Sequence, residues 1–391
     1  MAPPDWSQLH RDILQHISKT LNSEFYQIRF RSVCSSWRSS IPKNHHHHFN
    51  LPLKFPIPSD DDSNSNSNSN FHLSKRNVFL ITPPPNQKQT LHPWLIKIGP
   101  DSKQQTHLWH PLSRDKKLPF HFHDVIDFNQ HRVIHLGTEF VFGDLPSSLY
   151  RNNIEKIVVF DADTWHIGKG KVSYSVLLTI HVSGKLAICR CGDERWTVIP
   201  GMATPYDDVC VFNGRPFAVD SNGQTVAVGL DLSLEFVAEP VFGGNKKFLV
   251  ESNGELLLVD KYMISVQHEG FLDDHGDGVG NYEIGFGRKR AVKFDVFRLD
   301  SMRKKWVEVR NLKDRVLVLG EGCAFSVLAL DLGMKNGNCV IYKDEAFRHV
   351  HVTGLGVRVF CLDKHRISPL VDVPHYNKLF WPPPEWLKLR W

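Results

Sequence analysis

The sequence predicts a mainly β protein, with a small all-α module at its N-terminus and one large β domain after it. Two observations support this prediction. Between residues 4 and 42, apolar residues recur at i, i+3, i+4 and i+7, the spacing of one helix face. Later in the chain, Asn-Gly and Ser-Gly pairs separate short apolar runs, a pattern typical of β-hairpins.

The first region, residues 4–42, is expected to form two amphipathic helices. Their apolar faces comprise Leu9, Ile13, Leu14, Ile17 and Leu21 in the first, and Ile28, Phe30, Val33, Cys34 and Trp37 in the second. A module of this size cannot bury that much apolar surface on itself, and it has no cysteine pair or metal-ligand cluster to compensate. The helices must therefore pack on the β domain or bind another protein.

The second region, residues 43–74, is expected to be a flexible low-complexity linker. It contains NHHHH, a proline-interrupted LPLKFPIP and the run SDDDSNSNSNSN. Alternating Ser and Asn bury no apolar surface and favour local side-chain bonds over regular structure. A long linker favours a separate partner for the helices, because packing on the same chain would not require it.

The third region, residues 75–365, reads as a β-propeller. Hairpin signals occur in HVSGKLAI, VFNGRPFAV, DSNGQTVAV and VESNGELLLV, and a Trp recurs in TWHI, RWTV, KWVEV and LWHPL. Four-stranded units with a periodic aromatic are typical of propeller blades, which run about 40–50 residues, so we expect about six or seven blades. A large β-sandwich or two small barrels would give similar turn signals.

Residues 366–391 form a Pro/Trp-rich tail that we expect to pack on the propeller. Proline restricts its backbone, and three Trp residues follow within FWPPPEWLKLRW. Loops carry the specificity of repeat folds, so the long Gly/Asp-rich insertion at 273–289 is the first place to seek contacts with a target.

Composition and charge exclude several classes. The net charge of +5 is a mild excess of scattered basic residues, which does not indicate nucleic-acid binding. No apolar run approaches the roughly 20 residues that span a bilayer, and the N-terminus has no secretion signal. Seven cysteines without such a signal are expected to be reduced thiols, so we expect the protein in the nucleus and/or the cytoplasm.

The helical region resembles an F-box. The match lies in DWSQLHRDILQHISKTLNSEFYQIRFRSVCSSWRSSI, where Val33-Cys34-Ser35-Ser36-Trp37-Arg38 reproduces the closing Val-Cys-x-x-Trp-Arg of that family. His10 departs from the pattern, which usually has Pro after the Leu. Since Pro at a first helical turn only pre-sets φ, we expect a weaker helix start rather than loss of the fold.

The remainder resembles the KIB-type β-propeller that follows the F-box in a SKIP-like plant family. The matching stretches are DDVCVFNGRPFAVD, KKFLVESNGELLLVD, FDVFRLDSMRKKWVEVRNLKDRVLVLG, GNCVIY and KLFWPPPEWL. The resemblance implies a substrate-receptor subunit of an SCF-type ubiquitin ligase. Its F-box would bind a Skp-family adaptor and through it a cullin, and its propeller would bind an unknown target protein.

On this resemblance, nine apolar residues share two tasks, packing the module and facing the adaptor: Leu9, Ile13, Leu14, Ile17, Ile28, Phe30, Val33, Cys34 and Trp37. The sequence does not separate the two tasks. Trp37 is the first candidate for a contact residue, because Trp is enriched among interface hot spots.

No motif calls for catalysis, a cofactor or a metal. The chain contains no nucleophile elbow, H-E-x-x-H or phosphate loop, and Cys189-Arg190-Cys191 lacks the second pair that a zinc site needs. Two other functions remain open at this stage. The propeller could be a hydrolase or an oxidase with an accessory helical module, or the chain could be an F-box scaffold that acts outside a ligase.

Overall fold

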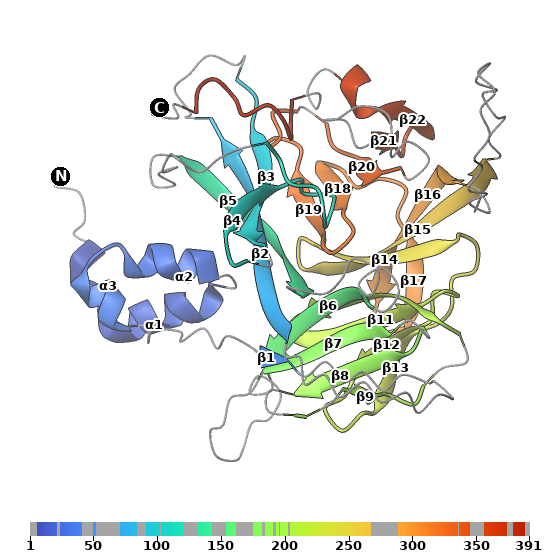
Figure 1. Cartoon of the computed structure of the whole chain (residues 1–391), viewed down its shortest axis with the longest axis horizontal. Helices are drawn as coiled ribbons and strands as arrows, with labels where there is room; N and C mark the ends of the chain where they lie inside the picture. Colours follow the sequence, from blue (N-terminus) through green and yellow to red (C-terminus); the bar gives the residue numbers. More distant parts are fainter. Residues whose placement is uncertain are drawn as a thin grey trace, which may run out of the picture. The chain divides into compact units, whose positions relative to one another are not determined.

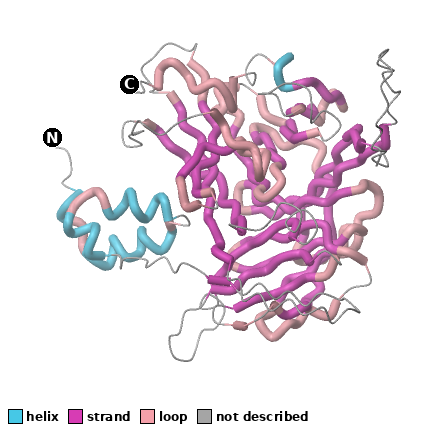
Figure 2. Tube along the Cα trace, viewed as in Figure 1, coloured by secondary structure: helices cyan, strands magenta, loops and turns pink. Residues whose placement is uncertain are grey.

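The structure, a computed structural model, forms two compact units, residues 1–49 and 50–391. It describes residues 6–21, 24–40, 50–51, 71–83, 91–101, 103–119, 131–142, 154–161, 175–181, 184–190, 193–194, 196–201, 204–266, 288–334, 336–344, 356–373 and 378–387. Figure 2 shows helix in the first unit, and strands and loops through the second apart from the short helix η4 (Leu370–Asp372). Within these ranges no helix is both long enough and apolar enough to cross a membrane.

The first unit consists of a short 3-10 helix and three α-helices. They are η1 (Trp6–Gln8), α1 (Arg11–Thr20), α2 (Glu24–Arg31) and α3 (Ser35–Ser40). The predicted first helix corresponds to α1. The predicted second helix, from Ile28 to Trp37, is wrong in one respect, because a turn at residues 32–34 divides it into α2 and α3.

Serine side chains account for that division. The Ser32 hydroxyl donates to the carbonyl of Arg29 at 2.6 Å, and the Val33 amide donates to Phe30 in a tightened last turn. Serine at such positions competes with the helical ladder by bonding nearby backbone groups. The helix restarts where the Arg38 amide donates to the carbonyl of Cys34 at 2.9 Å.

Five antiparallel or mixed sheets make up the described part of the second unit. Blade 1 contains β1 (Asn50–Leu51), β2 (Phe71–Thr82), β3 (Trp94–Pro100), β4 (Thr106–Trp109) and β5 (Arg132–Phe142). Blade 2 contains β6 (Ile154–Asp161), β7 (Ser175–His181), β8 (Leu186–Arg190) and β9 (Thr197–Val198). Blade 3 contains β10 (Tyr206–Phe212), β11 (Arg215–Asp220), β12 (Thr225–Val228) and β13 (Leu234–Ala238).

The two remaining blades follow in order. Blade 4 contains β14 (Lys246–Ser252), β15 (Glu255–Val266), β16 (Arg288–Asp300) and β17 (Lys305–Glu308). Blade 5 contains β18 (Arg315–Leu319), β19 (Ala324–Leu328), β20 (Cys339–Lys343), β21 (Val357–Cys361) and β22 (Arg366–Pro369). The order in blade 5 is β19-β18-β20-β21-β22, and its β18–β20 pair is parallel.

The five sheets close into a ring through one terminal strand of each (Figure 1). Strand β5 contacts β6, β6 contacts β10, β10 contacts β14, β14 contacts β19, and β19 contacts β5. This closed circuit is a β-propeller, as the sequence predicted. The predicted six or seven blades are too many, because five sheets cover residues 50–369, or about 64 residues per blade rather than about 40–50.

The Asn-Gly signals mark hairpins, as predicted. Asn213 and Gly214 have φ values of 50° and 74° between β10 and β11, and Asn253 and Gly254 have 55° and 76° between β14 and β15. Two consecutive positive φ angles define the type I′ turn, whose twist matches that of the strands. The local sequence is therefore sufficient to determine these two reversals.

The recurring Trp lies on or beside the outermost strand of three blades. Trp109 in β4, Trp196 before β9 and Trp306 in β17 are all buried. The Trp306 indole donates to the Thr225 hydroxyl of blade 3 at 3.3 Å. The periodic aromatic therefore packs outer strands, and in blade 4 it also joins neighbouring blades.

The C-terminal segment contacts blade 1. The Leu95 amide donates to the carbonyl of Leu379 at 2.8 Å, and the Trp94 indole donates to the carbonyl of Phe380 at 3.0 Å. Leu379 and Phe380 belong to the same hydrophobic cluster as Val316 in blade 5. Residues 378–387 therefore contribute to the contact between the first and last blades. Strand β2 begins at Phe71 and pairs with β1, so β1 and the first four residues of β2 lie inside the range expected as linker.

The free energy of unfolding should decrease as the pH drops below about 6.5, because of one buried histidine. His110 lies buried beside Phe380, with the ring centroids 4.7 Å apart. Burial, helped by Lys97 and Lys343, lowers the pKa of His110 to about 3. Between about pH 6.5 and 3 the unfolded chain binds a proton that the folded chain does not, so acid removes up to about 1.4 kcal/mol per pH unit. Thermal unfolding between pH 7 and 5 should show a smaller loss for His110→Asn, and equal slopes would contradict this assignment.

Candidate functional site

The structure divides the nine predicted adaptor-binding residues into internal and exposed groups. Leu14 and Phe30 form the buried centre of the helical unit. Leu9, Ile17 and Trp37 are half-buried and pack against that centre. These five residues therefore take part in packing the module.

Three of the nine residues are apolar and about half exposed to solvent. The exposed fractions are 49% for Ile13, 57% for Ile28 and 55% for Val33, while Cys34 is half-buried. Trp6, which was not among the predicted residues, is 61% exposed. Helical spacing assigned Ile13 to the same face as Leu14, and only the packed structure distinguishes the two.

Trp37 contributes to the module's own structure. Its ring lies 4.4 Å from the ring of Phe30, centroid to centroid, and its indole donates to the carbonyl of Trp6 at 2.9 Å. It therefore connects α3 to both α2 and η1. The exposed Ile13 and Ile28 are more direct candidates than Trp37 for contact with a partner.

Arg38 of the Val-Cys-x-x-Trp-Arg motif stabilises the turn between α2 and α3. Its guanidinium donates to the carbonyl of Arg31 at 3.3 Å, and the Arg31 guanidinium donates to the carbonyl of Arg38 at 3.0 Å. These two hydrogen bonds connect the end of α2 to α3 across the turn that contains Val33 and Cys34.

His10 caps α1 in place of the expected proline. Its backbone is extended, with ψ of 144°, and its Nδ1 accepts from the Asp12 amide at 3.5 Å. Its carbonyl accepts from Ile13 and Leu14, both at 3.1 Å. A side-chain acceptor at the N-cap satisfies an amide that the helix leaves unpaired, so the helix start is retained without proline.

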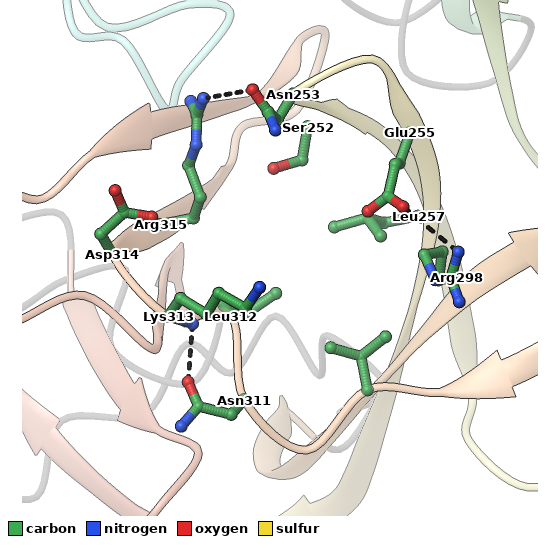
Figure 3. A pocket seen from close by; sticks show the side chains of 11 residues that line it. Ser252, Asn253, Glu255, Leu257, Arg298, Asn311, Leu312, Lys313, Asp314 and Arg315 are labelled. Carbon is green, nitrogen blue, oxygen red and sulfur yellow. Dashed lines mark hydrogen bonds and ion pairs between the residues drawn. The ribbon is translucent and has the colours of Figure 1, made fainter.

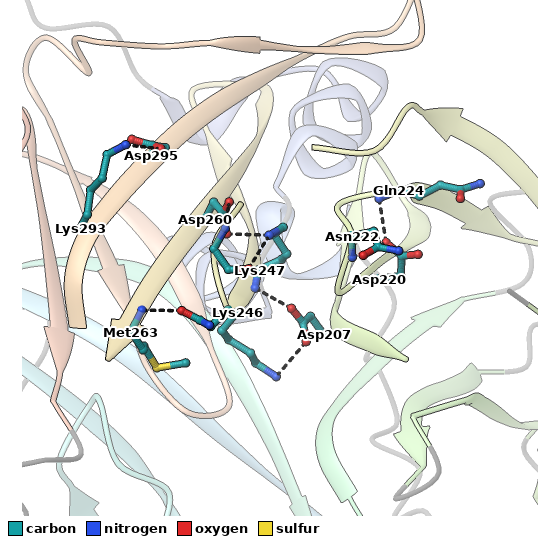
Figure 4. A network of polar contacts seen from close by, with 12 residues as sticks. Asp207, Asp220, Asn222, Gln224, Lys246, Lys247, Asp260, Met263, Lys293 and Asp295 are labelled. Carbon is teal, nitrogen blue, oxygen red and sulfur yellow. Dashed lines mark hydrogen bonds and ion pairs between the residues drawn. The ribbon is translucent and has the colours of Figure 1, made fainter. Parts of the chain in front are cut away.

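Charged side chains inside the propeller are arranged as ion pairs. In blade 4, the Lys247 ammonium lies 2.7 Å from Asp260, and both side chains are fully buried. Figure 4 shows this pair. Asp260 also accepts from the Gly244 amide at 2.8 Å, and Lys247 donates to the Gly244 carbonyl at 3.2 Å. Both charges are thereby matched inside the blade.

Consecutive aspartates on β10 connect blades 2, 3 and 4. Asp208 lies 2.8 Å from Lys156 of β6 and accepts from the Leu249 amide of β14 at 2.8 Å. Asp207 accepts from the Lys247 amide at 2.8 Å. Burial alone would lower the pKa of Lys156, but the adjacent Asp208 carboxylate reverses this effect and raises it.

Blade 1 has a buried pair of the same kind. Lys97 lies 2.6 Å from Glu139 and donates to the carbonyl of Ser113 at 2.6 Å. Burial lowers the pKa of Lys97 despite this carboxylate. A Cβ added to Gly322 would lie 2.1 Å from Glu139, so only glycine leaves room for it. These pairs give the buried carboxylates of blades 1, 3 and 4 a structural role.

The described ranges contain no group of three His, Cys, Asp or Glu residues that could hold a metal ion. Cys34, Cys210, Cys323 and Cys361 are free thiols, and Cys191 of the C-x-C motif lies outside these ranges. Burial raises the pKa of Cys323 to about 11 and that of Cys210 to about 12, so both thiols are protonated at neutral pH. Of the insertion at 273–289, only its last two residues are described.

Comparison with known proteins bears on both units. Residues 6–49 match the F-box domain family, and residues 70–363 match the KIB1-4 β-propeller family. The chain belongs to the F-box proteins with a KIB1-4 β-propeller. It is 41% identical to "F-box protein SKIP23" and 35% identical to "F-box protein At2g17036", both of Arabidopsis thaliana. Each alignment covers 98% of this chain and 95% of the relative.

The family assignment confirms the resemblance drawn from Val33-Cys34-x-x-Trp37-Arg38 and from the propeller stretches. A third relative, "Putative F-box protein At5g60060" of the same plant, is 29% identical over 88% of this chain. An F-box domain implies a Skp-family adaptor as a partner of this protein. The family names describe an F-box protein rather than an enzyme.

Proposed function

We propose that this F-box protein is the substrate-recognition subunit of an SCF-type ubiquitin ligase. The F-box would bind a Skp-family adaptor and through it a cullin, while the propeller binds the protein to be ubiquitinated. The observation that carries this proposal is the presence of an F-box and a propeller in one chain, as two separately compact units. Ubiquitin transfer occurs on other subunits, so the chain itself needs no catalytic residue.

The exposed apolar residues of the helical unit support adaptor binding. Ile13, Ile28 and Val33 leave large apolar areas in water that the module's own core does not cover. Burying such areas against a partner is favourable by about 25 cal/mol per Å². We infer that the same complex forms in the nucleus and/or the cytoplasm, where the free thiols of Cys34, Cys210, Cys323 and Cys361 would stay reduced.

A reconstitution experiment tests the proposal. The full chain, mixed with a Skp-family adaptor and a cullin, should co-elute with both in size-exclusion chromatography. The combined Trp37→Ala and Ile13→Ala variant should elute apart from both while its propeller remains folded. Co-elution of the variant at wild-type yield would contradict adaptor binding through the helical unit.

The scaffold alternative makes the same adaptor contact and differs only in the cullin. A chain that binds the adaptor but excludes the cullin from the complex would indicate a scaffold outside a ligase. Candidate targets can be sought by affinity purification with the proteasome blocked, comparing wild type with the double variant. Proteins retained by both forms, but more abundant with the variant, would be substrates.

A further inference from the structure

A cavity of about 360 Å³ lies between blades 4 and 5 (Figure 3), and none of its lining residues takes part in the buried ion pairs described above. One side is formed by the β14–β15 turn and the adjoining ends of β15 and β16. The other side is the connection from β17 to β18, residues 309–315. A volume near the lower end of ligand sites suits one or two side chains of a peptide.

The floor of this cavity is apolar and its rim is polar. Leu257 and Leu312 are buried at the floor, and Val309 beside them is half-buried. Asn253 and Asn311 provide amides at the rim, suited to the backbone of a bound segment. Apolar floors with a few convergent polar groups are typical of binding sites.

The charges of the rim favour a carboxylate ligand. Arg298 forms an ion pair with Glu255 at 3.2 Å, so these two charges cancel. The other charged residues of the lining are two cations, Lys313 and Arg315, and one acid, Asp314. Asp314 lies at the margin opposite Glu255 and Arg298 (Figure 3). Within the described residues the Lys313 ammonium has no hydrogen-bond or ion-pair partner, while the Arg315 guanidinium donates to Asn253 at 3.3 Å.

The connection that carries both cations is held in place before any ligand arrives. The side-chain oxygen of the buried Asn338 accepts from the Leu312 amide at 2.8 Å, and the backbone amide of Asn338 donates to the carbonyl of Arg315 at 2.8 Å. Gly337 permits this approach, because a Cβ there would lie 2.5 Å from Asp314. Lys313 takes a φ of 58°, with its amide bound to the Asn311 side chain. A site organised in advance loses less entropy on binding.

We propose that this cavity binds a short segment of the target protein in which an apolar side chain is flanked by carboxylates. The apolar side chain lies on Leu257 and Leu312, and the carboxylates contact Lys313 and Arg315. The inference rests on the proposed function, since it names the surface and the chemistry by which the propeller would select its target.

The test uses the free full-length chain and fluorescein-labelled synthetic peptides. The probes are Gly-Asp-Asp-X-Asp-Gly with Leu, Ile, Met or Phe at X, and their affinities are measured by fluorescence anisotropy. At least one probe should bind. Its affinity should fall in a peptide in which Asn replaces every Asp, and in a peptide in which Gly replaces X. Its affinity should also fall when the salt concentration is raised. Failure of every probe to bind more tightly than about 1 mM would overturn the proposal.

Charge variants assign any binding to this cavity. Lys313→Glu should weaken binding by about tenfold or more, whereas Lys185→Glu, an exposed lysine of blade 2, should leave it unchanged. Lys313→Asn removes the charge with a residue that tolerates positive φ, and it serves if Lys313→Glu does not fold. Equal affinity of wild type and a folded Lys313 variant would overturn the proposal. Because the adaptor is absent, this result is independent of whether the F-box binds it.

Discussion

Lys247→Met should destabilise the propeller by about 3–5 kcal/mol. The substitution removes the ammonium that lies 2.7 Å from Asp260, and it leaves a carboxylate buried where no water reaches it. Removing one partner of a buried pair costs more than the pair contributes, because the remaining charge is uncompensated. The effect is measured as the shift in the free energy of unfolding by urea denaturation monitored through tryptophan fluorescence.

Lys246→Met is the matched control for this prediction. Lys246 is adjacent in sequence, its side chain is partly exposed, and its ammonium lies 3.9 Å from Asp207. Exposed or partly exposed pairs contribute about 0–1 kcal/mol, so this variant should be nearly as stable as wild type. Adding Asp260→Asn to Lys247→Met should recover part of the loss, since the neutral amide can still accept from Gly244. Equal losses for Lys246→Met and Lys247→Met would refute the assigned role.

The combined Ile13→Asp and Ile28→Asp variant should lose adaptor binding while the chain stays folded. Both side chains are about half exposed in the free protein, so carboxylates there are hydrated and cost little until an apolar partner covers them. A hot-spot substitution costs about 2 kcal/mol or more, roughly thirtyfold in Kd, and two should abolish detectable binding. Isothermal titration of the adaptor into each variant measures the change.

Leu14→Ala provides the contrast, because Leu14 is fully buried at the centre of the helical unit. Truncating a buried leucine costs about 2–5 kcal/mol, which a module of this size cannot tolerate. Hydrogen exchange should therefore show lost protection in α1–α3 of Leu14→Ala, and wild-type protection in the double aspartate variant. Wild-type adaptor affinity in the double variant would exclude Ile13 and Ile28 from the interface.

Several features could be predicted from short stretches of sequence. The Asn-Gly hairpins follow from the positive φ values that their turns require, as at Asn213 and Asn253. The α1 helix follows from apolar periodicity. The break between α2 and α3 was missed, although Ser32 and Ser35 flank it and serine is the residue type that competes with helical hydrogen bonds.

Other features depend on residues that lie far apart in the chain. The buried ion pairs form only because strands that are well separated along the chain pack together, as for Lys97 with Glu139 and for Lys156 with Asp208. The blade count was overestimated because the estimate assumed about 40–50 residues per blade. The connections between strands make the blades longer than this, and hydrophobic periodicity does not reveal their lengths. No pattern separated the exposed Ile13 from the buried Leu14, since they are neighbours on one helical face.

The sequence by itself determined the fold class, the F-box with its propeller, and the positions of the hairpin turns. The fold class and the turns depend on backbone preferences and spacings confined to a few consecutive residues, whereas the F-box and the type of propeller follow from a resemblance to known sequences. The tertiary structure alone decided the five-bladed ring, which apolar residues of the helical unit stay exposed, and the cavity between blades 4 and 5. Each of these depends on contacts among segments distant in sequence, where burial and charge pairing decide which side chains remain free to bind.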